Sequence, residues 1–252
     1  MKSGINVLSL FDGMSCGRIA LERAGIKVNN YYASEIDKYA TAISNKNYPD
    51  IIRLGDINNW KEWDLPKIDL VIGGSPCQGF SIAGEGLNFE DPRSKLFFTF
   101  FNILVSLITK NPDMKFLLEN VKMKKEWKDV ITKYLSVSPI LINSSLVSAQ
   151  NRERLYWTSI SKEILQPEDK GIILGDILET TEFIDTKERW GSLKMTGMAT
   201  DIKGFDITKR IYSPSGKSPS LTTMQGGNRQ PKIDIRGAAV RNQVTKRVQK
   251  NN

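Results

Sequence analysis

The sequence has no histidine, only two cysteines and no long apolar run. Without histidine, zinc sites and acid–base catalysis by imidazole are excluded, so any chemistry must use cysteine, carboxylates, lysine, arginine or the backbone. Cys16 and Cys77 do not make a disulfide framework, which favours a reducing, cytoplasmic setting. No stretch reaches the roughly 18 apolar residues of a membrane span, and the first residues lack the apolar core of a signal peptide. We therefore expect no metal and no membrane association.

The charges that are present favour a polyanionic partner. The 252 residues carry 36 lysines and arginines against 28 aspartates and glutamates, a formal net charge of +8. This balance suits a nucleic acid, although many soluble enzymes are mildly basic as well. No acidic residue follows Asp234, so the chain ends in a basic tail, which we interpret as a solvated terminus.

Short apolar segments alternate with helical segments over the first 160 residues. This alternation predicts an α/β fold with a doubly wound, mostly parallel sheet. The first helix has Ser15 as its expected N-cap and Gly25 as its end. The predicted strands cover residues 6–11, 30–34, 51–54, 69–73, 115–120, 139–147 and 154–160, and the predicted helices cover 15–25, 38–49, 94–111 and 124–135.

The periodic pattern is lost beyond about residue 160. The following segments are polar, contain glycine and proline, and show neither repeats nor low complexity. We predict a cofactor-binding catalytic domain over residues 1–162, a small irregular second domain over 163–231 and a basic tail over 232–252.

The loop 11–17, "FDGMSCG", joins the first predicted strand to the first predicted helix. Gly13 and Gly17 permit a tight turn and a close backbone approach, and a helix N-terminus favours an anionic group. Glu35 ends the second strand, where an acid is placed to bind the two hydroxyls of a ribose. Asp56 follows the third strand, within reach of an adenine amine. Together these residues indicate an adenosine-type cofactor, although the spacing is not the GxGxxG of dinucleotide enzymes.

Cys77 follows the buried strand 69–73 on a loop of small residues, "GGSPCQGFS". It is either an exposed nucleophile or a small buried hydrophobic residue. Glu119 follows an apolar run at the end of the next predicted strand, and parallel strands end at the same edge of a sheet, so the two side chains would face one site. A carboxylate raises the pKa of a nearby thiol. The pair therefore makes sense if the carboxyl group is protonated and donates a hydrogen bond to a substrate.

Two arginines stand at alternate positions of the extended segment "QNRERLYW". Alternate side chains of an extended segment point the same way, so Arg152 and Arg154 would bind a phosphate or a carbonyl oxygen together. The other interpretation is a pair of surface salt bridges, which are more common.

The ordered motifs "FDGMSCG", "SEID", "GDI", "GGSPCQGFS", "DPRSKLFF", "LLENV" and "QNRERLYW" resemble those of the DNA cytosine-5 methyltransferases. The resemblance covers about residues 5 to 160, and "GKSPSLTTMQGG" extends it to about residue 227. The compact stretch after residue 160 is similar to the target-recognition region of small bacterial and phage members. The resemblance implies a Rossmann-like methyltransferase domain, S-adenosylmethionine as cofactor and double-stranded DNA as partner. It also implies DNA methylation, in a restriction-modification setting, within a bacterial nucleoid or a phage-infected cell.

By this resemblance, Cys77 is the covalent nucleophile that adds to carbon 6 of a cytosine flipped out of the helix. Glu119 holds the ring at N3, and Arg154, with Arg152, engages the base carbonyl and the nearby backbone. The residues implied for cofactor binding are Phe11, Asp12, Gly13, Ser15, Cys16, Gly17, Glu35, Ile36, Asp56, Ile57, Pro76 and Leu96. The residues implied for DNA binding are Gln78, Ser81, Arg93, Gln150, Thr222, Gly226 and Gly227.

The sequence departs from the family near its end. The Gly-Asn-containing segment that completes the family's cofactor pocket is not recognisable, nor is the "LTP-x-E" region before it. One alternative is therefore a truncated or split methyltransferase subunit that binds DNA or a partner without autonomous activity. A second polypeptide would then complete the pocket. Another alternative is an RNA cytosine-5 methyltransferase. Gln78, directly after the cysteine, favours DNA over RNA as the substrate.

Overall fold

The computed structural model describes residues 4–76, 92–179, 189–220 and 232–234. The chain divides into two compact units. We call them the sheet unit (Met1–Ile142 with Arg154–Ile164) and the small unit (Asn143–Glu153 with Leu165–Asn252). The domain bounds predicted from the sequence, at 162 and 231, stay predictions.

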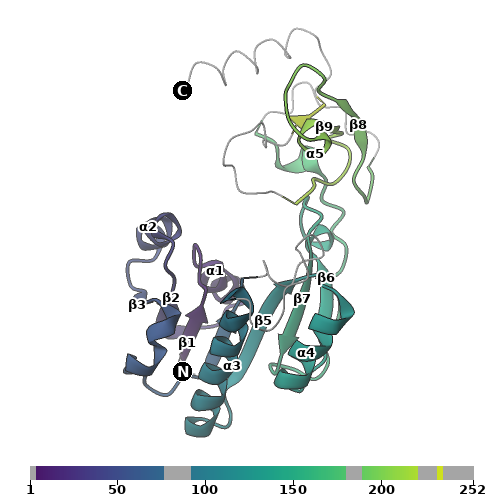
Figure 1. The fold of residues 1–252 in the computed structure, drawn as a ribbon. Coiled ribbons are helices and arrows are strands. Elements are labelled where there is room, and N and C mark those ends of the chain that lie inside the picture. The colour runs from purple at the N-terminus through teal and green to yellow at the C-terminus, as the bar shows by residue number, and fades with distance from the viewer. Residues whose placement is uncertain (1–3, 77–91, 180–188, 221–231, 235–252) are drawn as a thin grey trace. The chain divides into compact units, whose positions relative to one another are not determined.

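A seven-stranded sheet with the order β3-β2-β1-β4-β5-β7-β6 forms the centre of the fold (Figure 1). The pairs β1–β2, β2–β3, β1–β4 and β4–β5 are parallel, and β5–β7 is antiparallel. The doubly wound, mostly parallel sheet predicted from the strand–helix alternation is therefore confirmed. The strands are β1 (Ile5–Leu10), β2 (Val28–Ser34), β3 (Ile52–Gly55), β4 (Leu70–Gly73), β5 (Lys115–Val121), β6 (Ile140–Asn143) and β7 (Glu153–Thr158).

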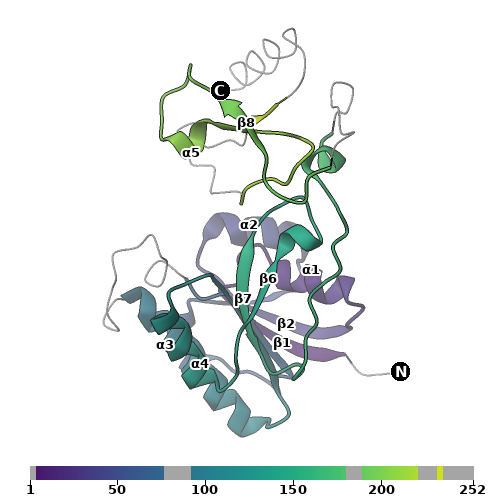
Figure 2. The same cartoon turned by 90° about the vertical axis from the view of Figure 1, so that its right-hand side faces the viewer.

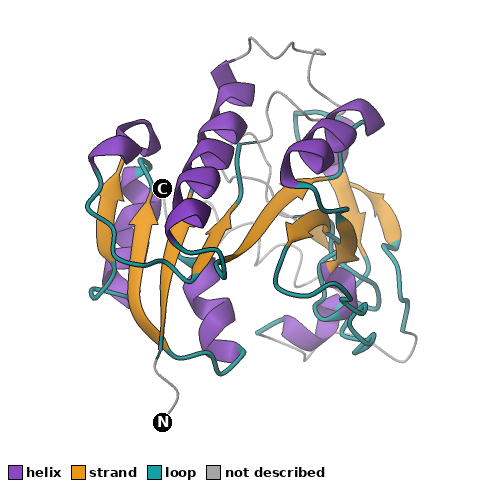
Figure 3. Cartoon of the chain, turned by 90° about the horizontal axis from the view of Figure 1, so that it is seen from below, coloured by secondary structure: helices purple, strands orange, loops and turns teal. Residues whose placement is uncertain are grey.

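Helices cover both faces of this sheet (Figures 2 and 3). Neighbouring residues of a strand point to opposite faces, so Leu8 joins the core beneath α3 and α4 while Val7 joins the core on the face of α1. None of the helices in the described ranges is long and apolar enough to cross a membrane. The α-helices of this unit are α1 (Cys16–Arg23), α2 (Lys38–Asn47), α3 (Pro92–Lys110) and α4 (Lys125–Leu135), and a 3-10 helix, η1 (Ile57–Glu62), follows β3.

One local prediction holds in position only, and another is wrong. Ser15 occupies the predicted N-cap position of α1, but it has φ 64° and its side chain makes no capping hydrogen bond, because its hydroxyl bonds to other buried side chains. The strand predicted over 139–147 ends at Asn143. There the Asn143 carboxamide oxygen accepts a hydrogen bond from the Ser145 amide, which begins the short 3-10 helix η2 (Ser144–Leu146).

The small unit contains a three-stranded sheet with the order β10-β9-β8 and long connecting segments. Strands β8 and β9 are antiparallel, and β9 and β10 are parallel. This small second sheet agrees with the irregular second domain that the sequence predicts. Its elements are η3 (Leu174–Ile177), β8 (Met195–Met198), α5 (Asp206–Lys209), β9 (Arg210–Tyr212) and β10 (Lys232–Ile233).

Lys217 is the largest charged side chain buried in the small unit's described residues, with 1% of its surface exposed. Its ammonium group donates to the backbone carbonyls of Ser145 at 2.6 Å, Ile172 at 2.6 Å and Ser148 at 3.3 Å. The carboxylate of Asp169 lies 4.0 Å away. A fully buried lysine is rare unless its donors are satisfied. Lys217 therefore joins two separate segments of the small unit, 145–148 and 169–172, to its own segment.

Replacing Lys217 with methionine is expected to lower the free energy of unfolding by about 2–4 kcal/mol, since three partly buried carbonyls lose their donor. Urea unfolding measures the change. The matched control is Lys170→Met, because the Lys170 side chain is exposed and its bond to Leu146 comes from the backbone amide. Equal unfolding free energies for the two variants would contradict the role given to Lys217.

Candidate functional site at the carboxyl ends of the parallel strands

The parallel strands end in register at one edge of the sheet. Leu10 pairs with Ser34 on one side and with Gly73 on the other, and the same row continues through Gly55 and Leu118. The next residue of each strand therefore belongs to a second row along this edge. That row consists of Phe11, Glu35, Asp56, Gly74 and Glu119.

The loop after β1 has an unusual backbone. Phe11, Gly13 and Ser15 have φ values of 58°, 59° and 64°, in the left-handed region. This conformation costs a non-glycine residue about 1–2 kcal/mol, so the surrounding contacts must hold Phe11 and Ser15 in place. Gly17 serves packing instead, because a Cβ there would overlap Ile72 and the Tyr31 hydroxyl.

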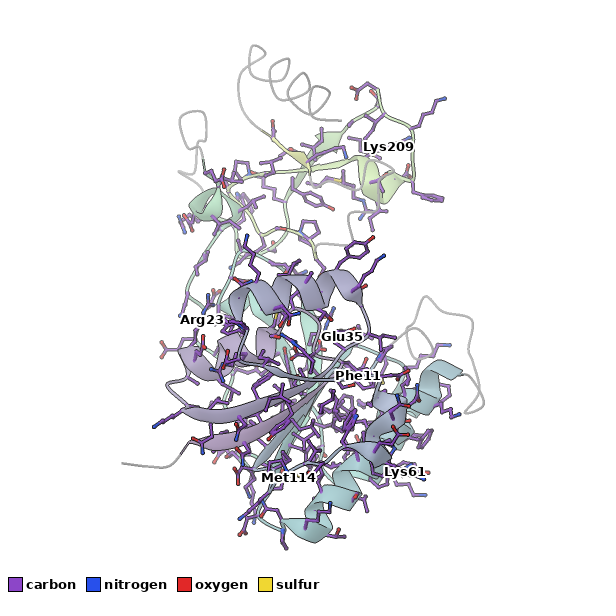
Figure 4. All side chains as sticks on the ribbon, turned by 90° about the vertical axis from the view of Figure 1, so that its left-hand side faces the viewer. Phe11, Arg23, Glu35, Lys61, Met114 and Lys209 are labelled. Carbon is purple, nitrogen blue, oxygen red and sulfur yellow. The ribbon has the colours of Figure 1, made fainter. Side chains whose placement is uncertain are left out.

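Glu35 is fixed by backbone donors. Its Oε2 accepts a hydrogen bond from the Gly13 amide at 2.8 Å, and its Oε1 accepts from the amides of Ile36 and Asp37, both at 2.8 Å. Figure 4 labels Phe11 and Glu35 at this edge of the sheet. A carboxylate has about four acceptor positions, so Oε2 retains one for a further donor such as a hydroxyl.

The neighbouring residues suit the remainder of a nucleoside. Asp56 Oδ1 accepts from the amide and the side-chain nitrogen of Asn58, which leaves Oδ2 for an amine. Ile57 is buried at the start of η1, whereas Ile36 is 75% exposed beside Glu35 and offers an apolar surface. Two carboxylates and an exposed aliphatic side chain fit the hydroxyls, the amine and the ring face of an adenosine-type group.

Asp12 and Ser15 turn inward, away from this edge. The Asp12 carboxylate accepts hydrogen bonds from the Tyr31 hydroxyl at 2.9 Å and from the Ser15 hydroxyl. Ser15 also contacts the Ser44 hydroxyl of α2, and Arg53 Nη1 lies 3.6 Å from Asp12 Oδ2. The Asp12 and Ser15 side chains thus bond to the protein interior, and their predicted contact with a cofactor would have to come from the backbone.

The buried Tyr31 hydroxyl is expected to make the free energy of unfolding fall at high pH. Burial, and next the negative charge of Asp12, raise the pKa of the Tyr31 hydroxyl far above its ordinary value of 10.0. Folding keeps the hydroxyl protonated, so its contribution to stability is complete below about pH 10 and falls as the pH rises beyond that. From about pH 10 to 12, the free energy of unfolding should fall more steeply in the wild type than in Tyr31→Phe, by up to about 1.4 kcal/mol per pH unit. Urea unfolding across this range measures the two slopes, and equal slopes would disprove the expectation.

A second constellation lies at the end of β5. Arg154 Nε and Glu119 Oε1 form an ion pair at 2.7 Å, with 16% and 33% of the two side chains exposed. In the antiparallel register, Glu119 faces Tyr156 and Val121 faces Arg154, so all four side chains share one face of the sheet.

Gly74, directly after β4, lies against this pair. A Cβ at Gly74 would be 3.0 Å from Glu119 Oε2, so the glycine leaves room for the carboxyl group. Ser75 is buried, and its carbonyl and hydroxyl accept hydrogen bonds from the Asn120 side chain at 3.4 and 3.2 Å. The segment that leads to Cys77 is thereby joined to the end of β5, next to Glu119. Asn120 is not among the site residues predicted from the sequence, although a polar residue at the end of an apolar strand is a usable signal.

The other predicted site residues are placed as follows. Cys16 is exposed at the first residue of α1, Pro76 is half-buried at the end of the described segment, and Leu96 packs partly against the core from α3. Arg152 belongs to the small unit, where its amide donates to Asn143, and Gln150 bridges to Ser218 in the same unit. Arg93 lies in the first turn of α3. The residues outside the described ranges are Cys77, Gln78, Ser81, Thr222, Gly226 and Gly227.

In the ranges that the structure describes, no three acidic or cysteine side chains gather in a group able to hold a metal ion.

Comparison with known proteins gives one consistent result. The family model described as C-5 cytosine-specific DNA methylase matches residues 5–213. An orphan methyltransferase of Bacillus phage SPR is 35% identical over 289 residues, which cover 88% of this chain and 64% of the relative. A type II methyltransferase of Neisseria gonorrhoeae is 35% identical over 193 residues, 71% of this chain and 59% of the relative. An orphan methyltransferase of Bacillus phage rho11s is 26% identical over 356 residues, which cover 92% of this chain and 70% of the relative.

The fold also matches a solved structure. The crystal structure of a Spodoptera frugiperda DNMT2 mutant superposes with a TM-score of 0.59 and covers 99% of this chain and 80% of that chain. At 19% sequence identity, this match shows the fold alone.

Proposed function

The chain belongs to the C-5 cytosine-specific DNA methylase family, and on that premise we propose that it transfers a methyl group from S-adenosylmethionine to carbon 5 of cytosine in double-stranded DNA. The observation that carries the proposal is the Glu119–Arg154 pair beside Gly74, in the segment that leads to Cys77. Together with the thiol that we propose for Cys77, a carboxyl group and a guanidinium would then be available to one planar ring.

The cofactor is proposed to bind along the row of strand ends. Glu35 Oε2 would accept from a ribose hydroxyl, Asp56 Oδ2 from the adenine amine, and Ile36 would lie against the ring. Phe11 and the loop up to Gly17 would enclose the methionine part. When bound, S-adenosylmethionine supplies an electrophilic methyl group on a positively charged sulfur.

The chemistry proposed for the chain starts at Cys77. Its thiolate forms a bond to carbon 6 of the cytosine, and the displaced π electrons make carbon 5 a nucleophile. Glu119 holds the proton at N3, which neutralises the charge that the ring gains, and Arg154 binds the ring carbonyl. After carbon 5 has accepted the methyl group, whose bond to sulfur breaks to leave S-adenosylhomocysteine, a base would remove the carbon 5 proton, the C5–C6 double bond would re-form and the thiolate of Cys77 would leave.

Carbon 6 of a cytosine is stacked between its neighbours in duplex DNA. Attack by Cys77 therefore requires the base to leave the helix, which is the usual solution of enzymes that modify bases. We propose that the DNA contacts come from Gln78, Ser81, Arg93, Gln150, Thr222, Gly226 and Gly227, with the region 163–231 responsible for target recognition.

The test is methyl transfer by the purified chain from labelled S-adenosylmethionine to mixed-sequence duplex DNA, with structured RNA as competitor. The expected product is 5-methylcytosine in the digested DNA. Label found mainly in RNA would instead identify an RNA methyltransferase. A folded chain that binds S-adenosylhomocysteine but transfers no label would favour the predicted subunit that needs a second polypeptide.

A further inference from the structure

A buried polar cluster lies behind the loop that follows β1. Its members are Asp12, Ser15, Tyr31 and Ser44, all buried, together with Arg53 of β3. The Asp12 side chain has no exposed surface. A carboxylate in such a place needs a compensating charge, and Arg53 Nη1 lies 3.6 Å from its Oδ2.

The guanidinium of Arg53 joins three elements of the sheet unit. From β3 it donates through Nη2 to the Ser44 hydroxyl at 2.7 Å and through Nε to the Asn45 side-chain oxygen at 2.9 Å, both on α2. Nη1 is buried and faces the Asp12 carboxylate without a hydrogen bond, so its contribution there is the charge. Arg53 thus connects α2 to the loop after β1 through both Ser44 and Asp12.

That loop has two faces with different tasks. On the inner face, Asp12 and Ser15 bond to the buried cluster. On the outer face, the Gly13 amide donates to Glu35, at the edge where the cofactor is proposed to bind. Phe11 and Ser15 keep left-handed backbone conformations, which persist only where the surroundings hold them. The hydrogen bonds of Asp12 and Ser15 on the inner face are the contacts that can hold these backbone conformations.

We propose that Arg53 is a positioning residue for the cofactor: paired with Asp12, it holds the loop after β1 in the conformation that binds S-adenosylmethionine, without touching the cofactor itself. The inference rests on the proposed function. It assigns a role to a residue that no motif in the sequence identified, and it gives Asp12 and Ser15 a task behind the cofactor instead of against it.

The test compares a variant that lacks one charge of the Asp12–Arg53 pair with a variant that lacks both charges. Arg53→Met leaves the Asp12 carboxylate buried without its counter-charge, and the loop would have to move to hydrate it. Binding of S-adenosylhomocysteine, measured by calorimetry, should weaken at least about tenfold, which corresponds to about 1.4 kcal/mol. The double variant Asp12→Asn/Arg53→Met contains neither charge, and its affinity should return to within about threefold of the wild type.

The matched control is Lys125→Met. Lys125 of α4 pairs with Asp129 at 2.6 Å on an exposed surface, and neither residue belongs to the buried cluster or to the loop after β1, so its loss should leave the affinity unchanged. In transfer assays, Arg53→Met should raise the KM for S-adenosylmethionine and leave kcat at saturating cofactor unchanged. A residue that serves stability alone would not raise the KM while leaving kcat unchanged. Should Arg53→Met fail to fold, Ser44→Ala removes the shared hydroxyl and should weaken binding about threefold.

The outcomes separate this inference from the proposed function. A wild-type chain that does not bind S-adenosylhomocysteine would overturn the proposed cofactor site and this inference together. If the wild type binds, equal affinities for Arg53→Met and Lys125→Met would overturn the role of Arg53 alone. A double variant that binds as weakly as Arg53→Met would likewise show that the charge pair is not the cause.

Discussion

Cys77→Ala is expected to reduce methyl transfer to DNA by about 10⁴-fold or more, because carbon 5 of cytosine is a poor nucleophile until a thiolate has added to carbon 6. Transfer of labelled methyl groups to duplex DNA measures the loss. The affinity for S-adenosylhomocysteine should stay at the wild-type value, since none of the residues proposed to bind the adenosine is changed. That binding measurement is the control for folding.

A trapped adduct provides an independent reading of the same step. In a duplex with 5-fluorocytosine at the target, carbon 5 has no proton to lose after methyl transfer, so the bond from Cys77 to carbon 6 cannot break again. The wild type should form a DNA complex that survives denaturing electrophoresis, and Cys77→Ala should form none. Transfer by Cys77→Ala at the wild-type rate would exclude the covalent route.

The second large effect on methyl transfer is expected at the Glu119–Arg154 ion pair. Glu119→Gln should lower kcat by about 10²–10³-fold, because an amide keeps the shape of the carboxyl group but cannot hold the proton at N3 with a negative charge. The affinity for S-adenosylhomocysteine should not change. Steady-state transfer to duplex DNA gives kcat, and Glu126→Gln, an exposed acid in the first turn of α4, is the matched control.

The partner of Glu119 offers a sharper test. Arg154 lies 2.7 Å from the carboxyl group and is largely buried, so the two side chains should act as one unit. Arg154→Met should also lower kcat, and the double variant Glu119→Gln/Arg154→Met should lose much less than the product of the two single losses. Fully multiplicative losses would contradict a shared role, and full activity of Glu119→Gln would exclude Glu119 from the reaction.

Much of the fold was readable from local patterns. Apolar segments bounded by glycine and acids predicted the parallel strands, since a strand buried on both faces leaves a contiguous apolar run. The acids at Glu35, Asp56 and Glu119 were located because each stands at or just after the end of a predicted strand, and the register of the sheet does place them in one row. The local pattern was misleading after Asn143, where a side-chain hydrogen bond ends the strand. At Ser15 it gave the N-cap position but not the side chain's partners, which come from a distant segment.

The sequence by itself determined the fold class, the order of the motifs and the edge of the sheet at which the chemistry-bearing residues gather. Those features depend on hydrophobic patterning and on residue types, which are local. Only the tertiary structure decided the direction of each side chain and its partners. It turned Asp12 and Ser15 inward, brought Arg53 and Ser44 to them, paired Glu119 with Arg154 and buried Lys217 among three carbonyls. Such partners come from distant segments, and their meeting depends on strand register and helix packing, which no short stretch of sequence encodes.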